Sequence, residues 1–228
     1  MDTSTKPTWS FSSVKTFDQC PKKYYHVKVA KDYKENFETE AILYGNEFHK
    51  AAEEYISGVV DTLDPRFDYA KDTLDKLNGM KGEKLCEIKM GLTSNLESCG
   101  FFDANVWFRG VADLVILDKQ AGVAKVIDYK TGKSAKYADK GQLELMALAI
   151  FKHFPEVHTV KGGLLFVVCN AFIKETYEIN QESELWRKWL TEYGKIEKAY
   201  ENDVWNPRPT GLCKAHCIVL ECAHNGRR

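Results

Sequence analysis

Two aspartates and a lysine stand at spacings that suit metal-dependent hydrolysis. Asp128 and Lys130 are two positions apart in "VIDYKTGK", and Asp113 lies fifteen residues earlier in "FRGVADLVILD". Residues two apart on a strand point to one face, and strand pairing would bring Asp113 close to Asp128. Two carboxylates at short range repel unless a cation lies between them, and Mg²⁺ or Mn²⁺ prefers oxygen ligands. A lysine beside that ion can position water and stabilise charge on a phosphate.

The tripeptide Asp-Tyr-Lys by itself carries little information, because residues 32–34 repeat the same letters. The earlier copy lies in the polar stretch "VAKDYKENFETE", which shows no strand pattern and follows no acidic strand. The later copy ends a β-branched run and follows the predicted strand that carries Asp113. Solvated charges on a surface strand are the alternative interpretation of Asp128 and Lys130, and this context favours the catalytic one.

Hydrophobic periodicity predicts the elements that must hold these residues. The first hundred residues read mainly as helices, and a strand hairpin, a helix, two strands and a long helix follow. The predicted helices span residues 12–20, capped by Ser12 or Ser13, then 42–56, 67–78, 82–98, 139–153 and 182–202. The predicted hairpin spans residues 104–131, and the two further strands span 160–170 and 171–179.

This order of elements indicates an α/β fold with a central mixed sheet flanked by helices. The pattern shows no linker, so we expect a single domain over residues 1–228. Its parts are a helical N-terminal part at about 10–100, a catalytic core at about 101–180, and a C-terminal helix with a cysteine-rich tail at about 181–228. The tail has two prolines, two glycines and three cysteines, which predicts an irregular appendage.

Charge, hydropathy and cysteine content limit the classes of protein to which the chain can belong. The formal net charge is −1, so the chain as a whole has no excess positive charge that would indicate nucleic-acid binding. A local basic groove is still compatible with this net charge. No apolar run approaches the roughly 18 residues that span a bilayer, and the N-terminus shows no signal pattern. We therefore expect no membrane contact and a cytoplasmic location, or the host cytoplasm if the gene is phage-borne. Seven cysteines without a secretion signal favour metal ligation or buried thiols over disulfides.

Four segments taken in order resemble a known family. The segments are "GNEFH", "FRGVADLVILD", "VIDYKTGK" and "GQLELMAL", and as an ordered set they are similar to the PD-(D/E)XK nuclease superfamily. More narrowly, they resemble its RecB-like branch, which includes the nuclease domains of RecB and AddB and the small CRISPR-adaptation exonucleases. The resemblance extends over nearly the whole chain. It implies a restriction-endonuclease-like core and a nuclease that depends on Mg²⁺ or Mn²⁺.

The resemblance also implies roles for individual residues. Asp113 matches the first acidic metal ligand, Asp128 the second acidic position, and Lys130 the catalytic lysine. The implied metal ligands are His49 of the G-x-x-x-H motif, Asp113, Asp128 and the backbone carbonyl of Tyr129. Gln142 matches the glutamine of a Q-L-x-x-Y motif, where it orients substrate or the catalytic lysine. Met146 stands where that motif carries tyrosine, which leaves the tyrosine's contribution open.

Several nearby side chains carry less specific signals. Glu53 lies four residues after His49, so both share one helix face and both could reach the site. Arg109 precedes the first aspartate on its strand and is a candidate for phosphate contact or for pairing with an acid. Lys133 and Lys136 follow the second strand and are candidates for a phosphate-binding groove, with a solvated loop as the alternative.

A second constellation consists of cysteines, namely Cys20, Cys213, Cys217 and Cys222. The three C-terminal thiols are close enough in sequence for a soft metal, and His216 and His224 could complete a zinc site. The resemblance implies a [4Fe-4S] cluster held by one N-terminal and three C-terminal cysteines, which would join the chain ends. The middle cysteine of the C-terminal trio is one position away from the common C-x2-C-x5-C spacing. A cluster, a zinc ion and uncoordinated thiols all stay open.

Together these features predict a DNA nuclease, and more narrowly an exonuclease, that hydrolyses phosphodiester bonds with metal-activated water. The expected substrate is single-stranded DNA or duplex ends. The small size and the lack of helicase motifs predict a stand-alone enzyme or a subunit that works with a helicase, recombination or CRISPR-adaptation partner. The alternative is a non-catalytic module that binds nucleic acid or protein and keeps the nuclease fold and the cysteine-bound metal.

Overall fold

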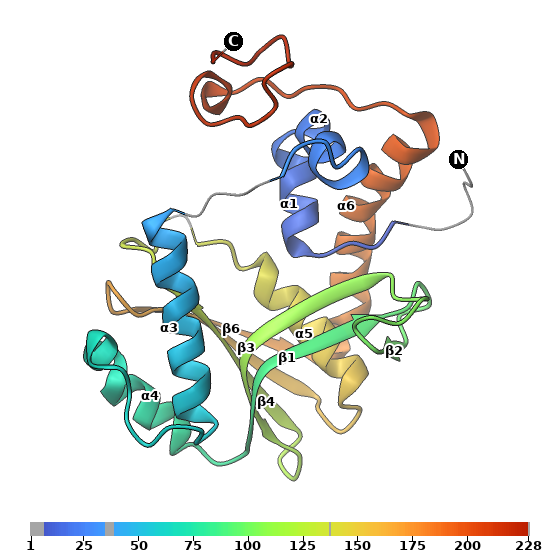
Figure 1. Cartoon of the computed structure of the whole chain (residues 1–228). Helices are drawn as coiled ribbons and strands as arrows, with labels where there is room; N and C mark the ends of the chain where they lie inside the picture. Colours follow the sequence, from blue (N-terminus) through green and yellow to red (C-terminus); the bar gives the residue numbers. More distant parts are fainter. Residues whose placement is uncertain (1–6, 35–38, 137, 228) are drawn as a thin grey trace. The chain divides into compact units, whose positions relative to one another are not determined.

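The computed structural model describes residues 7–34, 39–136 and 138–227, and a six-stranded mixed sheet forms its centre (Figure 1). The strands are β1 (Glu83–Leu92), β2 (Ser98–Cys99), β3 (Phe108–Asp118), β4 (Val123–Lys130), β5 (Thr159–Phe166) and β6 (Ala171–Glu178). They lie in the order β2-β1-β3-β4-β5-β6, and each neighbouring pair is antiparallel except β4 with β5. This sheet with its flanking helices confirms the expected α/β class.

Helices precede, interrupt and follow the sheet. The α-helices are α1 (Phe11–Gln19), α2 (Pro21–Tyr24), α3 (Glu40–Ile56), α4 (Lys71–Asn78), α5 (Gly141–His153) and α6 (Glu182–Asn202). Short 3-10 segments span Pro65–Ala70, Ile179–Gln181 and Gly211–Lys214, and a π-helical segment spans Tyr25–Val29. Ser10 caps α1 instead of the expected Ser12 or Ser13, because Ser13 is the third helical residue and completes a reciprocal capping box. None of the described helices is both long and apolar enough to cross a membrane.

The chain divides into two compact units. The terminal unit comprises Met1–Phe37 and Arg187–Arg228, and the sheet unit comprises Glu38–Trp186. The six strands and helices α3, α4 and α5 therefore belong to the sheet unit, and α1 and α2 belong to the terminal unit. The sequence predicted three successive parts of one domain, whereas the contacts group the two ends of the chain together.

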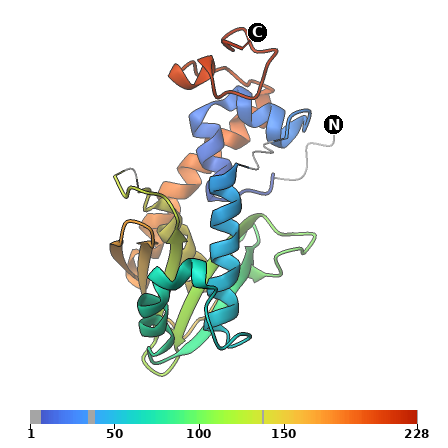
Figure 2. The ribbon, with the colours of Figure 1, turned by 60° about the vertical axis from the view of Figure 1, so that its left-hand side comes forward.

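Helices α3 and α4 cover one face of the sheet, as the views of Figures 1 and 2 agree. Their buried side chains, among them Phe48 and Leu74, form one apolar cluster with Leu114 and Ile127 of the sheet. Burial of such an apolar stripe against the sheet is the main force that holds an amphipathic helix in place. The cluster also includes Tyr129, so it fixes α3 against the end of the strand that carries the predicted lysine.

Helix α5 covers the opposite face and connects the parallel strands β4 and β5. A parallel pair requires such a crossover, and a helix is its usual form. Gly162 on β5 allows close packing, since a Cβ there would lie 3.2 Å from Leu143 of α5. The next residue, Gly163, faces Phe172 and Ile127 on the other side of the sheet. This packing places the first turn of α5 next to the end of β4.

Residues 82–98 are not the predicted helix, since they form strand β1, a turn and strand β2. The charged and apolar residues of this segment fit an amphipathic helix by local pattern alone. Its partner strand, β3, is distant in sequence, and nine residue pairs join the two strands. Tertiary pairing of this kind overrides local propensity. The helical first part therefore ends at Asn78, and the sheet begins at Glu83.

Candidate active site

Strands β3 and β4 separate where the two predicted aspartates lie. The last paired residues of their ladder are Leu114 and Ile127, so Asp113 and Asp128 come next on the two strands. In place of a further backbone pair, Asp113 Oδ2 accepts a hydrogen bond of 2.7 Å from the backbone N–H of Tyr129. The carboxylate of Asp113 thus fills the opening between the strands, at the same end of the sheet as Asp128.

Burial and the neighbouring charge of Asp113 both act on the pKa of Asp128. This residue is only 4% exposed, and burial, followed by the charge of Asp113, raises its pKa to about 6. Lys130 and His49 act in the opposite direction without cancelling the rise in pKa. A carboxyl group with such a pKa beside a second carboxyl group is typical of functional sites. A divalent cation between the two groups would remove the repulsion.

Helix α3 brings His49 to the first aspartate. The Nδ1 atom of His49 lies 3.5 Å from Asp113 Oδ2. Burial alone would lower the pKa of His49, but hydrogen bonding to Asp113 and the charges of Asp113 and Asp128 outweigh burial and raise it. The preceding residue, Phe48, is fully buried, and its ring packs edge-on against Tyr129 with centroids 5.7 Å apart. This anchor makes α3 present the imidazole to the strand ends.

Glu87 on β1 completes a group of three possible metal ligands, and the sequence did not predict it. One oxygen of Glu87, one oxygen of Asp113 and a ring nitrogen of His49 all lie within 4.8 Å of one another. Burial, followed by the charge of Asp113, raises the pKa of Glu87. These ligand types can hold a divalent ion. The alternation of apolar and polar residues in "CEIKMGL" was the signal that could have revealed a strand here.

Gln142 connects the second aspartate to the predicted catalytic lysine. Its Nε2 donates to Asp128 Oδ1 at 2.5 Å, and its Oε1 accepts from Lys130 Nζ at 3.2 Å. Lys130 Nζ also lies 2.6 Å from the buried Asp128 Oδ2, with which it forms an ion pair. Because Gln142 belongs to the first turn of α5, this helix holds the ammonium group beside the carboxylates while Lys130 stays partly exposed.

Glu53 and Tyr129 lie next to these ligands in different ways. Glu53 is one turn after His49 on α3, and its charge acts on Glu87 although it is outside the group of three. The Tyr129 ring belongs to the core, and burial, followed by the charges of Cys86 and Asp113, raises its pKa. The role of its backbone carbonyl as a ligand stays a prediction.

The predicted substrate-binding residues lie on β3 and in the loop after β4. The guanidinium of Arg109 lies over the rings of Phe101 and Phe102. Lys133 and Lys136 are exposed in the loop that follows β4. Their position after the strand that carries the lysine is compatible with phosphate contact, and this role stays a prediction.

Met146, which replaces the tyrosine of the family motif, is buried in the packing of α5. It is only 3% exposed, and a Cβ at Gly110 of β3 would lie 2.5 Å from its Cε atom. Gly110 therefore makes room for the flexible thioether side chain. At this position the chain fills the interface between helix and sheet, and Gln142 supplies the polar contact from the same helix.

The second Asp-Tyr-Lys copy has different surroundings. Asp32 Oδ2 lies 3.0 Å from Nδ1 of the buried His26, and an oxygen of Glu221 lies 3.3 Å from the same nitrogen. All three residues belong to the terminal unit, and Lys34 is exposed. This copy links the beginning of the chain to its tail, and one ligand atom from each of His26, Asp32 and Glu221 also lies within 4.8 Å of the other two. What this group lacks, within the described part of the chain, is a lysine held beside it by an aspartate and a glutamine, as Lys130 is held by Asp128 and Gln142.

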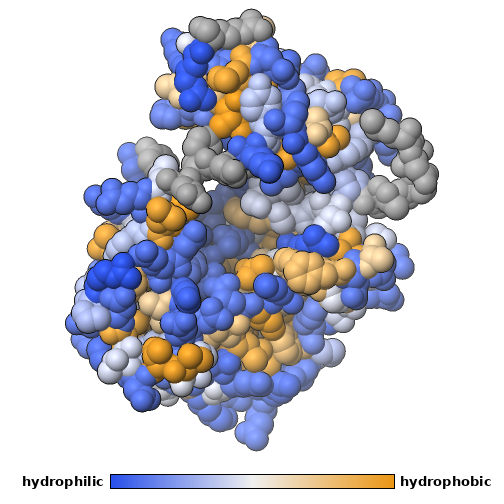
Figure 3. All heavy atoms as spheres, in the orientation of Figure 1, coloured by the Kyte–Doolittle hydropathy of each residue, from blue (hydrophilic) through white to orange (hydrophobic). Residues whose placement is uncertain are grey.

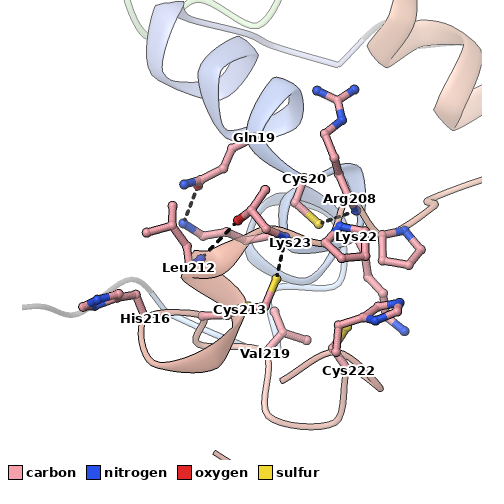
Figure 4. A pocket seen from close by; sticks show the side chains of 15 residues that line it. Gln19, Cys20, Lys22, Lys23, Arg208, Leu212, Cys213, His216, Val219 and Cys222 are labelled. Atoms are coloured by element: carbon pink, nitrogen blue, oxygen red, sulfur yellow. Dashed lines mark hydrogen bonds between the residues drawn. The ribbon is translucent and has the colours of Figure 1, made fainter. Parts of the chain in front are cut away.

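Four cysteines line a cavity in the terminal unit (Figure 4). The cavity has a volume of about 180 Å³, and its lining includes Cys20, Cys213, Cys217, Cys222, His216 and His224. The backbone N–H of Arg208 donates to Cys20 Sγ, and that of Thr210 donates to Cys213 Sγ, each at 3.4 Å. Backbone N–H donors of this kind surround the sulfurs of metal clusters. The predicted cysteine set is therefore brought together around a shared space.

Comparison with known proteins agrees with these features. The sequence model of the PD-(D/E)XK nuclease superfamily matches residues 8–87 and 79–222. The solved structure named "Crystal structure of SSO0001" is similar with a TM-score of 0.51 and 15% identity, over 97% of this chain and 88% of that chain. A crystal structure named "Putative exonuclease" from Eubacterium rectale is similar with a TM-score of 0.53 and 15% identity, over 90% and 85% of the two chains. A search of curated proteins finds no match.

At this level of identity the two solved structures establish a likeness of fold alone. The family match supports membership of the family as well as a likeness of fold, because its two segments together extend from residue 8 to residue 222. The expected resemblance to the superfamily is thereby confirmed, together with its sheet and flanking helices. The chain belongs to the PD-(D/E)XK nuclease superfamily.

Proposed function

We propose that this protein is a deoxyribonuclease that hydrolyses phosphodiester bonds with Mg²⁺ or Mn²⁺ at the site on β1, β3 and β4. The observation that carries the proposal is the convergence of His49, Glu87 and Asp113, whose ligand atoms lie within 4.8 Å of one another. Lys130 is paired with Asp128, whose pKa responds to the charges of both Asp113 and His49. A lysine beside an oxygen-rich group of ligands is the arrangement that phosphodiester hydrolysis needs.

The side chains of the site have distinct parts in the proposed reaction. His49, Glu87 and Asp113 each offer one ligand atom, and Asp128 offers its buried Oδ2, which lies 2.6 Å from Lys130 Nζ. A bound divalent ion lowers the pKa of a coordinated water and neutralises charge on the scissile phosphate. Lys130 Nζ, directed by Asp128 and Gln142, holds the attacking water and stabilises negative charge on the phosphate oxygens.

We further propose an exonuclease of the RecB-like branch that acts on single-stranded DNA or duplex ends. The solved structure named "Putative exonuclease" supports this type of cleavage. Cys20 and the three C-terminal cysteines around one cavity support the branch. We propose a helicase, recombination or CRISPR-adaptation protein as the partner that supplies DNA ends.

We also propose that the cysteine cavity holds a [4Fe-4S] cluster. Among the described residues, no three ligand atoms from the four cysteines, His216 and His224 lie within 4.8 Å of one another. A closed zinc site needs sulfurs about 3.8 Å apart, because four Zn–S bonds of about 2.3 Å point to the corners of a tetrahedron. A cluster of several iron atoms holds its cysteines further apart and fills the space between them. The cavity that Cys20 and the three C-terminal cysteines line together supports this proposal.

A cleavage assay tests the nuclease proposal. Single-stranded and blunt duplex DNA, labelled at either end, would be incubated with the protein and Mn²⁺ or Mg²⁺, with and without EDTA. We expect release of short products that EDTA abolishes. Lys130→Ala should lower the rate by about 10²- to 10³-fold, because a positioned donor to the reacting group is lost. Lys34→Ala, in the other copy of the same tripeptide, should keep the wild-type rate.

Three results would change the assignment. Equal rates for Lys130→Ala and Lys34→Ala would contradict the catalytic role of Lys130. Internal cuts in covalently closed circular DNA would exclude a strict exonuclease and keep the nuclease. Binding of DNA without cleavage under every metal condition would favour the non-catalytic module.

A further inference from the structure

Two phenylalanines and two cations form an exposed patch beside β1 and β3. Phe102 is 77% exposed, and Phe101 packs edge-on against it with ring centroids 5.0 Å apart. The central guanidinium carbon of Arg109 lies 5.3 Å from the Phe101 centroid and 5.9 Å from the Phe102 centroid. Lys89 Nζ lies 6.0 Å from the Phe102 centroid. Figure 3 shows hydrophobic side chains gathered over this part of the sheet among hydrophilic ones.

The loop that carries the two phenylalanines is fixed by its own hydrogen bonds. Asp103 Oδ2 accepts from the Gly100 N–H at 2.6 Å, and the Asp103 N–H donates to the Gly100 carbonyl at 3.1 Å. The N–H of the buried Trp107 then donates to the Leu92 carbonyl at 2.8 Å, which joins the loop to β1. A ring held in this way loses little freedom when a ligand binds, so its exposed apolar surface is available for binding.

The patch and the candidate metal group lie on the same two strands. Lys89 is two residues after Glu87 on β1. Arg109 is four residues before Asp113 on β3, which corresponds to about 13 Å along a strand. Arg109 Nε is buried and has no hydrogen-bond partner among the described residues. The positive charge of Arg109 beside exposed rings favours an anionic group on the ligand.

We propose that Phe101, Phe102, Lys89 and Arg109 form a stacking platform for an unpaired base of single-stranded DNA, an inference that rests on the proposed nuclease function. An unpaired base offers an open π-face to an exposed ring, whereas bases inside a duplex are already stacked on their neighbours. The two cations over the rings match the phosphates on either side of such a base. The platform would lead the strand to the carboxylates, so the strand is single where it passes Phe102.

Binding measured apart from cleavage tests the platform. The Lys130→Ala protein in EDTA would be titrated into a labelled oligothymidylate and into a blunt duplex of equal length, with fluorescence anisotropy as the readout. In that background Phe102→Leu keeps an apolar side chain and removes the π-face. We expect about tenfold weaker binding to the single strand and less than about twofold change on the duplex, and Phe102→Trp should restore the affinity.

The matched control is Val59→Ala, which alters an apolar residue of similar exposure, 72%, on the loop after α3. It should leave both affinities unchanged. Equal single-strand affinity for Phe102→Leu and its parent would overturn the platform, and so would an equal loss on the duplex. Circular dichroism and thermal unfolding check each variant, and we expect unchanged midpoints because Phe102 is exposed.

The platform and the nuclease proposal can fail separately. Binding that depends on Phe102, in a protein that cleaves no DNA under any metal condition, would keep the platform and refute the nuclease. Metal-dependent cleavage, together with single-strand binding that does not depend on Phe102, would keep the nuclease proposal and refute the platform.

Discussion

Glu87 on β1 stands opposite Asp113 on β3, in the register set by the residue pairs on either side. The ladder between the strands is interrupted at these two acids, and Glu87 has a left-handed backbone with φ of 48°. This conformation costs about 1–3 kcal/mol for a residue other than glycine and is retained mainly at functional sites. The distortion accompanies the approach of both carboxylates to His49, which supports the proposed role of Glu87 as a ligand.

Glu87→Gln removes an anionic ligand and keeps the size of the side chain. We expect the Mn²⁺ concentration for half-maximal cleavage to rise at least about tenfold, because one carboxylate that holds the ion is lost. Titration of the cleavage rate with Mn²⁺ measures this change. Glu83→Gln, at an exposed position on the same strand, should have no effect. Wild-type metal dependence in Glu87→Gln would exclude Glu87 from the metal site.

The raised pKa of Asp128, about 6, makes the stability of the metal-free protein depend on pH. The folded chain holds this proton more tightly than the unfolded chain, in which the group titrates near 3.8. The free energy of unfolding therefore falls as pH rises from about 4 to about 6, and this contribution is constant above that range. Thermal unfolding in EDTA measures the fall, and Asp128→Asn should reduce it. An unchanged profile in Asp128→Asn would show that another group causes the dependence.

Metal binding should depend on pH with the opposite sign. The ion needs an ionised Asp128 and a neutral His49, and both groups have a raised pKa in the folded chain. Protons therefore compete with the ion at low pH. We expect the increase in Tm caused by a fixed concentration of Mn²⁺ to grow from about pH 5 to about pH 8. A constant increase across this range would contradict titrating ligands.

Cys213→Ser removes one of the four sulfurs around the cavity of the terminal unit. If the cavity holds the proposed cluster, the wild-type protein is brown and contains iron, and we expect this variant to lose both. We also expect a decrease in Tm of about 5–10 °C, because cluster binding stabilises the fold that brings the sulfurs together. Cys169→Ser, at the exposed turn between β5 and β6, is the control and should keep both. Stoichiometric zinc in place of iron in the wild-type protein would replace the cluster with a zinc site.

Gly110→Ala tests the packing that accommodates Met146. The added Cβ would lie 2.5 Å from Met146 Cε, so we expect the free energy of unfolding to fall by about 1–3 kcal/mol. Met146→Ala makes room for that Cβ, so the double variant should lose less than the sum of the two single losses. Urea unfolding of the four proteins measures this coupling. Strict additivity would mean that the two residues do not share this space.

The parts of the fold that could be predicted are those whose local pattern and final environment agree. The hairpin of β3 and β4 combines β-branched residues with a turn at Gly122, and α5 and α6 have long apolar patterns. Strand β1 was missed because its pairing with β3 is set by distant residues and its own pattern is interrupted at Glu87. The division into two units could not be predicted either, since contacts between the chain ends leave no periodic signal.

The residues of the candidate site also divide into those that the sequence could predict and those that it could not. Asp113, Asp128 and Lys130 belong to strands with clear patterns, and their positions at the separating end of β3 and β4 follow from the register. Gln142 was identified by the resemblance alone, and only the packing of α5 shows that it bridges Asp128 and Lys130. Glu87 required β1 to be recognised first, so an error in one element concealed one member of the group of ligands.

The two units also differ in the order in which their residues are synthesised. The sheet unit is one continuous stretch, Glu38–Trp186, whereas the terminal unit joins Met1–Phe37 to Arg187–Arg228. The carboxylate group can therefore form before the last segment has left the ribosome, because domains fold as their residues emerge. The cavity that Cys20 lines cannot form until the three C-terminal cysteines have been synthesised. A metal group held by all four cysteines would therefore bind after the chain has made every residue of the proposed catalytic centre.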